Sequence, residues 1–472
     1  MPAAAPRPNF ILLFPDQWRG DALSGLGHPV AETPWLDALM RAGVTFPHAY
    51  SPAPSCIPAR ACLATGLTPS STGRLGQEEG VPWRYERTYM RLLRDGGYQT
   101  MLAGKTHFYP QMTALGYEKL LQYEAKVLGD APECDYHAWL ERAGGGHVRD
   151  TGMELNRNTW YPCPWPHPEH LHPNSWTMDA ALELLKRRDP QRPFLLHVGF
   201  NRPHPPFDPP VAWFQRYQGR EMPAPPVGEW VDRDASSAHL PAPSPAQLAD
   251  AQRAYYAQLA HLDYQVGRLI HYLKSAGSLW RDTFILFASD HGEMLGDHNR
   301  FGKVVPMEGS ARVPFVLKPA GGAKFEAGGR CEAPVTLSDV MPTLLEEAGL
   351  PVPGEVEGRS LSAALRGSGM PNREYVHGEM SLGAQGWQFV TDGREKFCWE
   401  SVSGREWFFD LREDPRECRN LAAAPAARPR VERWRGRLIE ILARRPQDGL
   451  SDGARLLAGK APPRTRPELK GA

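Results

Sequence analysis

Four short apolar segments of the sequence are each followed, within a few residues, by side chains that can bind a metal ion or move a proton. In an open α/β sheet, ligands bind beyond the carboxyl ends of the strands, so such residues meet when the segments form one sheet. One ending of this kind would carry little weight, but four of them indicate a shared site. The endings are Asp16 and Gln17 after Asn9–Phe14, Lys105 and His107 after Tyr98–Ala103, Asn201 and His204 after Phe194–Phe200, and Asp290 and His291 after Thr283–Ala288.

The first and last of these endings suit a metal ion. Asp16, Gln17, Asp290 and His291 offer carboxylate, amide and imidazole ligands. Oxygen ligands favour hard cations such as Ca²⁺ or Mg²⁺, and the imidazole also allows Mn²⁺. Each residue alone is as readily explained by a strand-end cap or a turn. Together they predict one divalent metal site.

A cysteine at the start of a predicted helix adds a nucleophile. The segment Ser51–Gly66 reads SPAPSCIPARACLATG, and its prolines favour an extended approach and a helix that starts just after Cys56. Backbone N–H groups at a helix N-terminus attract an anion. Arg60 lies one turn further along, so both side chains can share a helix face. A bare cysteine and arginine would instead be explained by helix capping and a surface charge.

The rest of the sequence indicates the elements that position these residues. Short apolar runs alternate with helical patterns, which predicts an α/β fold: a large, mainly parallel β-sheet sandwiched by helices. Thr33–Met40 and the long segment Pro245–Ser275 have helical spacing and suitable first-turn residues. Pro314–Lys318 could add a further strand.

Two long segments rich in Pro and aromatic residues interrupt this alternation. They are Tyr109–Ser175 and Pro205–Pro243. Long irregular segments in a compact domain usually serve a function, so we expect both to pack over the sheet edge and shape a pocket. Trp160, Tyr161 and Trp165 could either line that pocket or pack the segment against the domain.

The character of the sequence changes after about residue 354. Short aromatic runs predict a small antiparallel sheet, and roughly the last thirty residues, rich in Arg, Pro and Ala, predict a helix and a loose tail. We therefore expect a catalytic α/β domain over residues 1–353 and a small α+β subdomain over residues 354–472. The aromatic runs are Gln388–Val390, Lys396–Trp399 and Trp407–Leu411.

Composition excludes several classes of protein. The chain of 472 residues has 54 Lys+Arg and 54 Asp+Glu, and this neutral balance gives no support for binding to nucleic acid or a membrane surface. Phe10–Phe14 is too short for a signal peptide, and no apolar run reaches the length of a membrane span, so we expect a cytoplasmic protein. The odd count of 7 cysteines argues against a disulfide framework.

The segment Cys56–Arg60, CIPAR, resembles the C-x-P-x-R signature of the sulfatase family, part of the alkaline phosphatase superfamily. In that family a maturation enzyme converts the signature cysteine to formylglycine. Further blocks along about residues 8 to 425 are similar to those of the family. These blocks are Thr65-Gly66 with Pro69 and Gly73, Gly97–Thr100 with Gly104–His107, Pro203–Phe207, Ser289–Glu293 with Gly296–His298, Lys303 with Glu308 through Phe315, and Phe409–Leu411 with Asp414, Pro415, Asn420 and Leu421.

The resemblance implies a metal site and a modified nucleophile. Asp16, Gln17, Asp290 and His291 would bind one ion, with the modified Cys56 as a further ligand. Ca²⁺ is the expected ion, with Mg²⁺ or Mn²⁺ as alternatives. The hydrated aldehyde, 3-oxoalanine in its hydrate form, would use one hydroxyl to attack sulfur and the other to release sulfate.

The remaining residues would act on the substrate and the hydrate. Arg60 would stabilise the hydrate, and His107 would orient it and accept its proton. Lys105 and Lys303 would hold the sulfate oxygens. His204 would protonate the leaving oxygen, a contribution typically worth about 10²–10⁴-fold.

The sequence departs from the family pattern at two informative positions. Many sulfatases carry two aspartates where this chain has Asp16-Gln17, and a neutral second ligand also occurs in relatives that resemble phosphonate monoester and phosphodiester hydrolases. Gln77 stands where the family often has Asn. Both differences affect the expected substrate more than the chemistry.

Three functional hypotheses follow from these observations. The first is a sulfatase, arylsulfatase-like, that cleaves a small sulfate monoester and depends on a formylglycine-generating enzyme as its maturation partner. The second is a phosphonate monoester or phosphodiester hydrolase with the same formylglycine and metal. The third is a non-catalytic metal-holding protein in which Cys56 stays a thiol. The natural substrate could be an aryl sulfate, choline sulfate or a sulfated sugar, and the sequence is compatible with an oligomer.

Overall fold

The structure, a computed structural model, describes residues 7–124, 134–150, 158–231, 243–321, 328–367 and 373–470. Its centre is an 8-stranded sheet in which the strands from β5 to β7 are parallel and β8 is antiparallel to both its neighbours. The predicted α/β class is therefore confirmed. In spatial order the strands are β5 (Lys119–Gln122), β4 (Gln99–Gly104), β6 (Phe194–Phe200), β1 (Asn9–Pro15), β7 (Thr283–Ala288), β8 (Phe315–Lys318), β2 (Val44–Thr45) and β9 (Gly329–Arg330).

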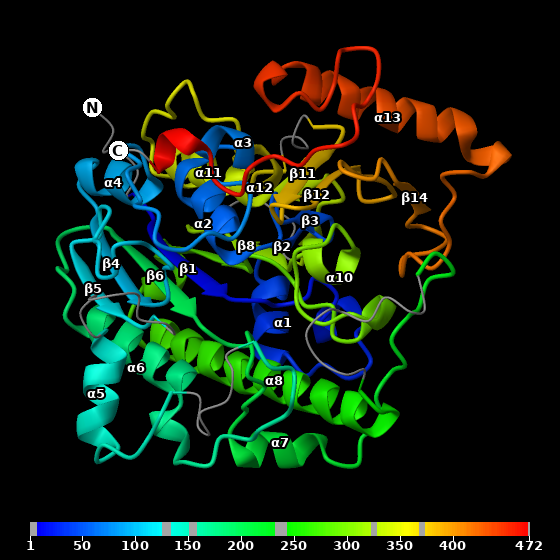
Figure 1. The fold of residues 1–472 in the computed structure, drawn as a ribbon. Helices are drawn as coiled ribbons and strands as arrows, with labels where there is room; N and C mark the ends of the chain where they lie inside the picture. Colours follow the sequence, from blue (N-terminus) through cyan, green and yellow to red (C-terminus); the bar gives the residue numbers. More distant parts are fainter. Residues whose placement is uncertain are drawn as a thin grey trace.

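Helices cover both faces of this sheet, as Figure 1 shows. The strands are apolar along their whole length because successive side chains point to opposite faces, and both faces are buried. Ile11 and Leu13 thus join one core, while Phe10 and Leu12 join the other. The first core contains α1 (Pro34–Arg41), α5 (Asp135–Ala143), α6 (Pro173–Lys186), α7 (Val211–Tyr217), α8 (Pro245–Ser275) and α9 (Leu279–Asp282); the second contains α2 (Cys56–Thr65), α4 (Tyr89–Asp95), α11 (Val340–Glu347) and α12 (Ser362–Leu365).

The segment expected to be irregular between Tyr109 and Ser175 is more regular than its composition suggested. It contributes the edge strand β5, all of α5 and the start of α6. Of the three aromatic residues left open, Trp165 is fully buried and Trp160 stacks on Phe301 with ring centroids 4.9 Å apart, so both pack the segment against the domain. Parts of both long segments, residues 125–133, 151–157 and 232–242, lie outside the described residues.

The predicted antiparallel sheet is present near the C-terminus. One face shares a core with the catalytic region through Tyr50, Met294 and Met307, and the other packs on α13 (Arg428–Ala443). The placement of the boundary between the two expected domains remains a prediction. The sheet contains β11 (Val376–Ser381), β12 (Gly386–Thr391), β13 (Glu395–Glu400) and β14 (Glu406–Asp410), and a separate two-stranded sheet pairs β3 (Ala49–Tyr50) with β10 (Val335–Thr336).

A buried ion-pair cluster joins this sheet to the catalytic region. Lys396 on β13 is fully buried, and its Nζ lies 2.9 Å from a Glu308 oxygen and 3.0 Å from a Glu417 oxygen. Glu308 begins α10 (Glu308–Ala311), just after the segment that carries Lys303. If Lys396 were removed, two buried carboxylates would lose the cation that they share, and their negative charges would destabilise the fold.

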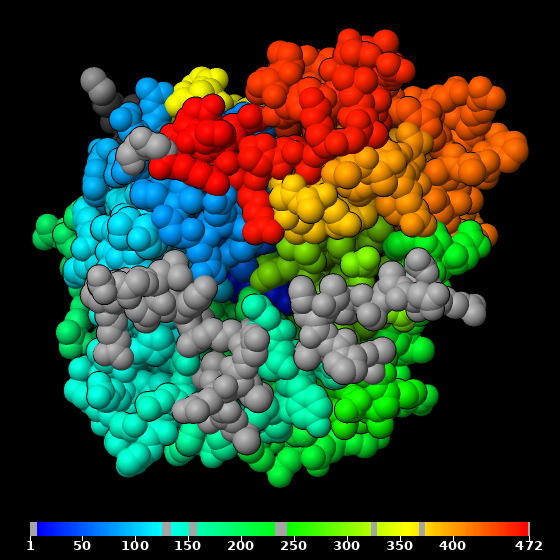
Figure 2. Space-filling view, in the orientation of Figure 1, coloured from blue at the N-terminus to red at the C-terminus, as the bar shows by residue number. Residues whose placement is uncertain are grey.

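The C-terminal segment is not the loose tail that its composition suggested. The predicted helix lies earlier, as α13, and the chain then returns to the catalytic region. The Arg464 carbonyl accepts from the N–H groups of Leu75 and Gly76, and the N–H of Arg466 donates to Gly73 O. In Figure 2 the red C-terminal segment accordingly lies against the blue segment that follows α2 and α3 (Pro69–Thr72). The polar composition of the C-terminal segment did not predict these backbone hydrogen bonds, because they join residues that are remote in the chain.

No helix within the described ranges combines the length and apolar character that a membrane crossing requires.

Candidate active site

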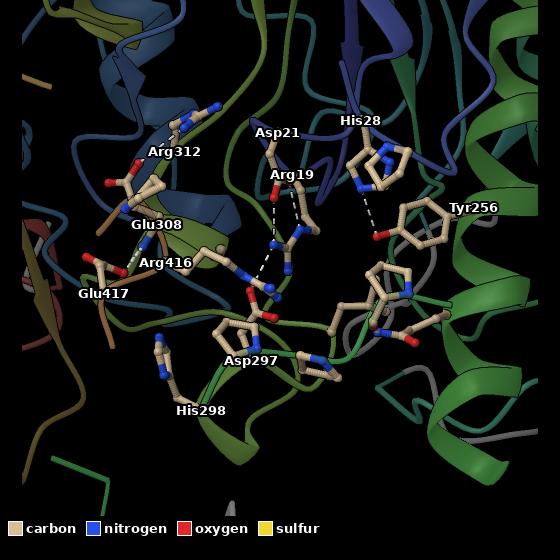
Figure 3. A pocket seen from close by; sticks show the side chains of 18 residues that line it. Arg19, Asp21, His28, Tyr256, Asp297, His298, Glu308, Arg312, Arg416 and Glu417 are labelled. Carbon is tan, nitrogen blue, oxygen red and sulfur yellow. Dashed lines mark hydrogen bonds and ion pairs between the residues drawn. The ribbon is translucent and has the colours of Figure 1, made fainter. Parts of the chain in front are cut away.

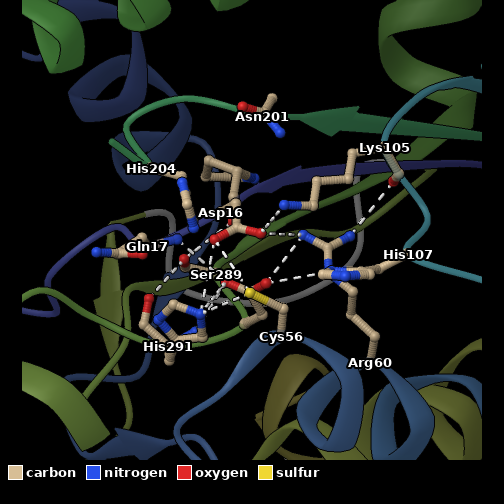
Figure 4. Close-up of polar contacts among 12 residues, drawn as sticks. Asp16, Gln17, Cys56, Arg60, Lys105, His107, Asn201, His204, Ser289 and His291 are labelled. Carbon is tan, nitrogen blue, oxygen red and sulfur yellow. Dashed lines mark hydrogen bonds and ion pairs between the residues drawn. The ribbon is translucent and has the colours of Figure 1, made fainter. Parts of the chain in front are cut away.

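The carboxyl ends of β1, β4, β6 and β7 meet at one edge of the sheet, and the N-terminus of α2 faces them. Figure 4 shows the side chains that converge there. The structure brings together every residue that the sequence singled out for the site: Asp16, Gln17, Cys56, Arg60, Lys105, His107, His204, Asp290, His291 and Lys303.

Cys56 lies at the centre of this group as the first residue of α2. Its Sγ is 3.3 Å from His291 Nε2, 3.6 Å from Asp16 Oδ1 and 3.1 Å from Lys303 Nζ. The side chain is 2% exposed, so its contacts are with protein groups of the site. A nucleophile formed at this position would act between metal-ligand residues on one side and a lysine on the other.

Gln77 holds the helix start that presents Cys56. Its Oε1 accepts from Ser55 Oγ at 2.9 Å and from the backbone N–H of Ile57 at 3.3 Å. Ser55 occupies the N-cap position but makes no side-chain capping bond to the helix backbone. Gln77 therefore satisfies a first-turn N–H group that a capping side chain would otherwise satisfy.

Two cations fix the carboxylates. Arg60 pairs with Asp290 at 2.9 Å and with Asp16 at 3.3 Å, and Lys105 Nζ lies 2.7 Å from Asp16 Oδ2. Arg60 and Asp16 are almost fully buried, so these ion pairs have little solvent screening. The fork of Arg60 sets the distance between the two acids.

Burial and neighbouring charges shift the pKa values of these groups in opposite directions. Burial alone would raise the pKa of Asp16, but Lys105 and the other cations hold it well below the ordinary value. Asp290 is deprived of water and faces Asp16, which raises its pKa. Burial and Asp16 oppose ionisation of Cys56, yet Lys303 and Lys105 hold the pKa of the thiol well below its usual range. The site therefore favours a negative charge at the Cys56 position.

His204 and His107 line the same cavity as Cys56. The Nδ1 of His204 lies 2.7 Å from the Pro205 carbonyl, so it carries the proton and leaves Nε2 as the variable position. Burial and Lys303 hold the pKa of His204 well below 6.5. The Nδ1 atom of His107 is buried and has no hydrogen-bond partner among the residues that the structure describes.

The sequence reasoning missed Glu124, which organises the segment after β4. Its Oε1 accepts from the backbone N–H groups of Thr106 at 2.8 Å and His107 at 2.6 Å, and from Thr106 Oγ1 at 2.7 Å. His107 has φ of 63°, a conformation that a non-glycine residue adopts only when surrounding contacts hold it. Glu124 lies in the segment read as irregular and belongs to no motif, so no local signal identified it.

The cavity above Cys56 has a volume of about 250 Å³. Four apolar or aromatic side chains of the lining, Val81, Trp83, Phe108 and Tyr109, form what we call the apolar wall. The rings of Trp83 and Phe108 pack with centroids 4.5 Å apart. The cavity thus offers a polar end for an anion and an apolar end for an organic group.

A larger cavity, about 370 Å³, lies on the other side of the segment after β7 and is shown in Figure 3. Its central charge, Arg19, pairs with Asp21 at 2.9 Å and Asp297 at 2.8 Å, and donates to the carbonyls of Glu293 and Met294. These contacts tie the segment after β1 to the segment after β7. Cys56, the candidate nucleophile, lines the smaller cavity, which is therefore the better candidate for the active site.

The residues present fit a divalent cation. Ligand atoms of Asp16, Cys56, Asp290 and His291 all lie within 4.8 Å of one another, and all four residues are buried. Gln17 offers an amide oxygen as well, which accepts from the same Lys303 Nζ that lies 3.1 Å from Cys56 Sγ. The predominance of oxygen ligands suits a hard ion such as Ca²⁺ or Mg²⁺. Within the described part of the chain, no other cluster of three or more His, Cys, Asp or Glu side chains has such a geometry.

Two family models match the chain. The sulfatase model matches residues 8–350, which include the whole candidate site, and the model for the C-terminal region of N-sulphoglucosamine sulphohydrolase matches residues 296–444. The two matches together span the catalytic region and the antiparallel sheet.

Relatives of known description agree with these matches. The chain is 37% identical to an arylsulfatase of Clostridium perfringens, over 96% of this chain and 98% of that one. It is 32% identical to the multifunctional alkaline phosphatase superfamily protein PehA of Trinickia caryophylli, over 89% and 92% of the two chains. A phosphonate monoester hydrolase of Agrobacterium radiobacter has the same fold, with a TM-score of 0.77 and 26% identity over 93% of this chain and 96% of that one. This chain belongs to the sulfatase family of the alkaline phosphatase superfamily.

Proposed function

We propose that the protein is a formylglycine-dependent arylsulfatase that cleaves small sulfate monoesters. The observation that carries this proposal is the position of Cys56. It lies within the family's maturation signature, at the polar end of a cavity, in contact with both a predicted metal-ligand group and Lys303. A structural cysteine would have no need of such a setting.

Asp16, Gln17, Asp290, His291 and the modified Cys56 would hold the metal ion. When bound, the ion supplies a Lewis acid beside the nucleophile and the transferring group. The hydrated aldehyde made from Cys56 would offer one hydroxyl to attack sulfur as the S–O bond to the alcohol breaks, and a second whose loss of a proton would re-form the aldehyde and release sulfate. Arg60 keeps the two carboxylates apart through its pairs of 2.9 and 3.3 Å, which preserves room for the ion.

Lys105 and Lys303 would bind the sulfate oxygens. Both ammonium groups lie at the polar end of the cavity, and Lys303 Nζ is already 3.1 Å from Cys56 Sγ. Donors placed before the reaction stabilise the charge that builds up on these oxygens without reorganisation in the transition state. Glu124 keeps Lys105 and His107 in place by holding the backbone between them.

His107 and His204 would move the protons. His107 lines the cavity with a free buried Nδ1, which suits it to accept a proton from the hydrate. Burial and Lys303 lower the pKa of His204 despite the opposing charge of Asp16, which favours the neutral ring before substrate binds. A sulfate anion placed between His204 and the lysines would raise that pKa, so that Nε2 could then deliver a proton to the leaving oxygen.

The apolar wall supports an aryl leaving group. Trp83 and Phe108 are almost fully buried, and with Val81 they form a surface on which a planar ring can pack. Among the described lining residues, Lys105 and Lys303 provide the only lysine or arginine side chains. A polyanionic sulfated glycan would need further cations for its other charges.

Mass spectrometry and paired rate measurements test this proposal. Protein made with a formylglycine-generating enzyme should show a tryptic peptide about 18 Da lighter at Cys56, because the thiol becomes an aldehyde. It should hydrolyse p-nitrophenyl sulfate faster than bis-p-nitrophenyl phosphate. The variant Cys56→Ala should hydrolyse neither compound above the background rate. An unmodified thiol under these conditions, with no turnover, would favour the non-catalytic metal-holding alternative.

A second candidate function is favoured by Gln17. A neutral side chain in place of an acid removes one negative charge from the ligand group, and the chain resembles both PehA and a phosphonate monoester hydrolase. This arrangement would tolerate a phosphodiester or phosphonate monoester as substrate. Faster hydrolysis of the phosphodiester than of the sulfate ester would establish this alternative.

A further inference from the structure

The side-chain amide of Gln17 is held in one orientation from both ends. Its Nε2 donates to Glu293 Oε2, and its Oε1 accepts from Lys303 Nζ at 2.9 Å. The backbone is held as well, because Gln17 N donates to Asp290 Oδ1 at 3.1 Å and Gln17 O accepts from Tyr255 Oη at 2.9 Å. The residue is 2% exposed and has φ of 74°, so it is fixed by its neighbours and not by local preference.

Glu293 cannot turn away from Gln17. Its Oε1 accepts from the backbone N–H groups of Leu295 at 2.9 Å and Gly302 at 2.5 Å, and the side chain is fully buried. Those two donors occupy one carboxylate oxygen and leave the other for the amide. A carboxylate is well suited here because both of its oxygens accept, one from the backbone and one from Gln17.

The orientation of this amide decides whether Gln17 can be a metal ligand. Hard cations bind amide oxygens, whereas an amide NH₂ group turned toward the same point would repel them. We propose that Glu293 is a positioning residue that selects the oxygen of Gln17 for the metal site, and that Gln17 and Glu293 work as a donor–acceptor pair. This inference rests on the proposed function only in assuming that the cluster binds a divalent cation.

The pairing fits a glutamine at position 17. A glutamine needs an acceptor behind it, and Glu293 supplies one. An acid at position 17 would instead place two negative charges in buried contact. In Glu293→Gln, the N–H groups of Leu295 and Gly302 would claim the new amide oxygen, so its NH₂ would face Gln17. Gln17 would then have to reverse and present its own NH₂ to the cluster.

Calorimetric titration with Ca²⁺ tests this pairing on protein made without a maturation enzyme, so that no sulfatase activity is needed. Glu293→Gln should bind Ca²⁺ roughly 10–100-fold more weakly, the usual effect of removing a group that orients a metal ligand. The exchange variant Gln17→Glu with Glu293→Gln restores a donor facing an acceptor and adds an acid to the ligand group, so its affinity should recover at least to that of the original protein. The matched control is Glu400→Gln. Glu400 is a buried carboxylate in the antiparallel sheet that also accepts from backbone N–H groups, and its substitution should leave Ca²⁺ affinity unchanged.

A second measurement does not depend on the metal. In Ca²⁺-free buffer, Gln17→Glu alone should melt at a lower temperature than the exchange variant, because only the single variant sets two carboxylates against each other. The inference is wrong if Glu293→Gln binds Ca²⁺ as tightly as the unaltered protein, if the exchange variant fails to recover binding, or if Gln17→Glu is as stable as the exchange variant. If Glu293→Gln does not fold, the inference is tested by Ca²⁺ binding to the exchange variant and by the order of the two melting temperatures. Matured, unaltered protein that binds a divalent cation but never hydrolyses a sulfate ester would refute the proposed function and leave this pairing standing. Failure to bind Ca²⁺, Mg²⁺ or Mn²⁺ would refute both.

Discussion

Removal of the Glu124 carboxylate should lower activity, although the contacts described for Glu124 are with the backbone near His107 and not with Cys56. Its Oε1 accepts four hydrogen bonds, two of them from the backbone N–H groups of Thr106 and His107, at 2.8 and 2.6 Å, with the others from Thr106 Oγ1 and Gln122 Nε2. In Glu124→Ala those donors lose a charged acceptor, and each such bond contributes about 1.5–3 kcal/mol. Because water from the cavity can replace part of this loss, we expect the free energy of unfolding to fall by about 2–4 kcal/mol.

The larger effect should be on catalysis. Without the carboxylate, the backbone N–H of His107 loses its acceptor, so its left-handed conformation is less firmly held and the segment from Lys105 onward can shift. A displacement of about 1 Å at a catalytic group can cost roughly 10²-fold in rate. We expect kcat/KM for p-nitrophenyl sulfate to fall by about that factor. Glu124→Gln keeps an oxygen for the two N–H groups, so its activity should stay within about tenfold of the unaltered enzyme.

Urea unfolding and steady-state kinetics measured on the same preparations separate positioning from general destabilisation. Glu400 is the matched control, since its carboxylate also accepts backbone N–H bonds, from Val402 at 3.0 Å and Ser403 at 2.6 Å, but lies in the antiparallel sheet. Glu400→Ala should lose a similar amount of stability and keep kcat/KM. If Glu124→Ala retained kcat/KM within about threefold while losing stability like Glu400→Ala, the positioning role assigned to Glu124 would be refuted.

Three further outcomes follow from the structure. Lys396→Met leaves two buried glutamates facing each other, so the free energy of unfolding should fall by about 3–5 kcal/mol in a urea titration; a loss below about 1 kcal/mol would contradict the buried ion-pair cluster. The contact with Asp150 contributes to raising the pKa of His137 to about 10, above its unfolded value, so the stability that this group adds is complete below about pH 6.5 and is lost as the pH rises to 10. The unfolding free energy of His137→Gln should therefore depend less on pH across that window, and an unchanged slope would count against the ion pair. Deletion of residues 464–472 removes the backbone bonds to the segment before Gln77; kcat/KM should fall because the helix start at Cys56 loses support, whereas full activity would show that the C-terminal segment is not needed.

Elements with a strong internal pattern were predictable. The segments Phe194–Phe200, Thr283–Ala288 and Pro245–Ser275 coincide with β6, β7 and α8, because apolar runs and helical spacing are set by neighbours within a few residues. The short edge strand β5 was not recognised. Its residues are partly exposed, and what makes it a strand is pairing with β4, about twenty residues away in the chain.

The site shows the same division. The residues at strand ends could be predicted to meet, because parallel strands in one sheet bring their carboxyl ends to one edge. The partners that hold them could not. Glu124 reaches back to His107 from a segment without a motif, and Glu293, although inside a recognised block, had no role until its contact with Gln17 was visible. The actual roles of the site residues in turnover remain proposals.

By itself, the sequence determined the α/β class, the family and the set of candidate site residues, since these depend on local periodicity and on short motifs. Only the tertiary structure decided how those side chains are oriented and what surrounds them. Lys303 meets Gln17 across 286 positions of the chain, and Arg466 donates to Ser70 across 396. Such contacts form because packing the whole chain brings remote polar groups into a buried space where each must find a partner, and no local pattern specifies which partner that is.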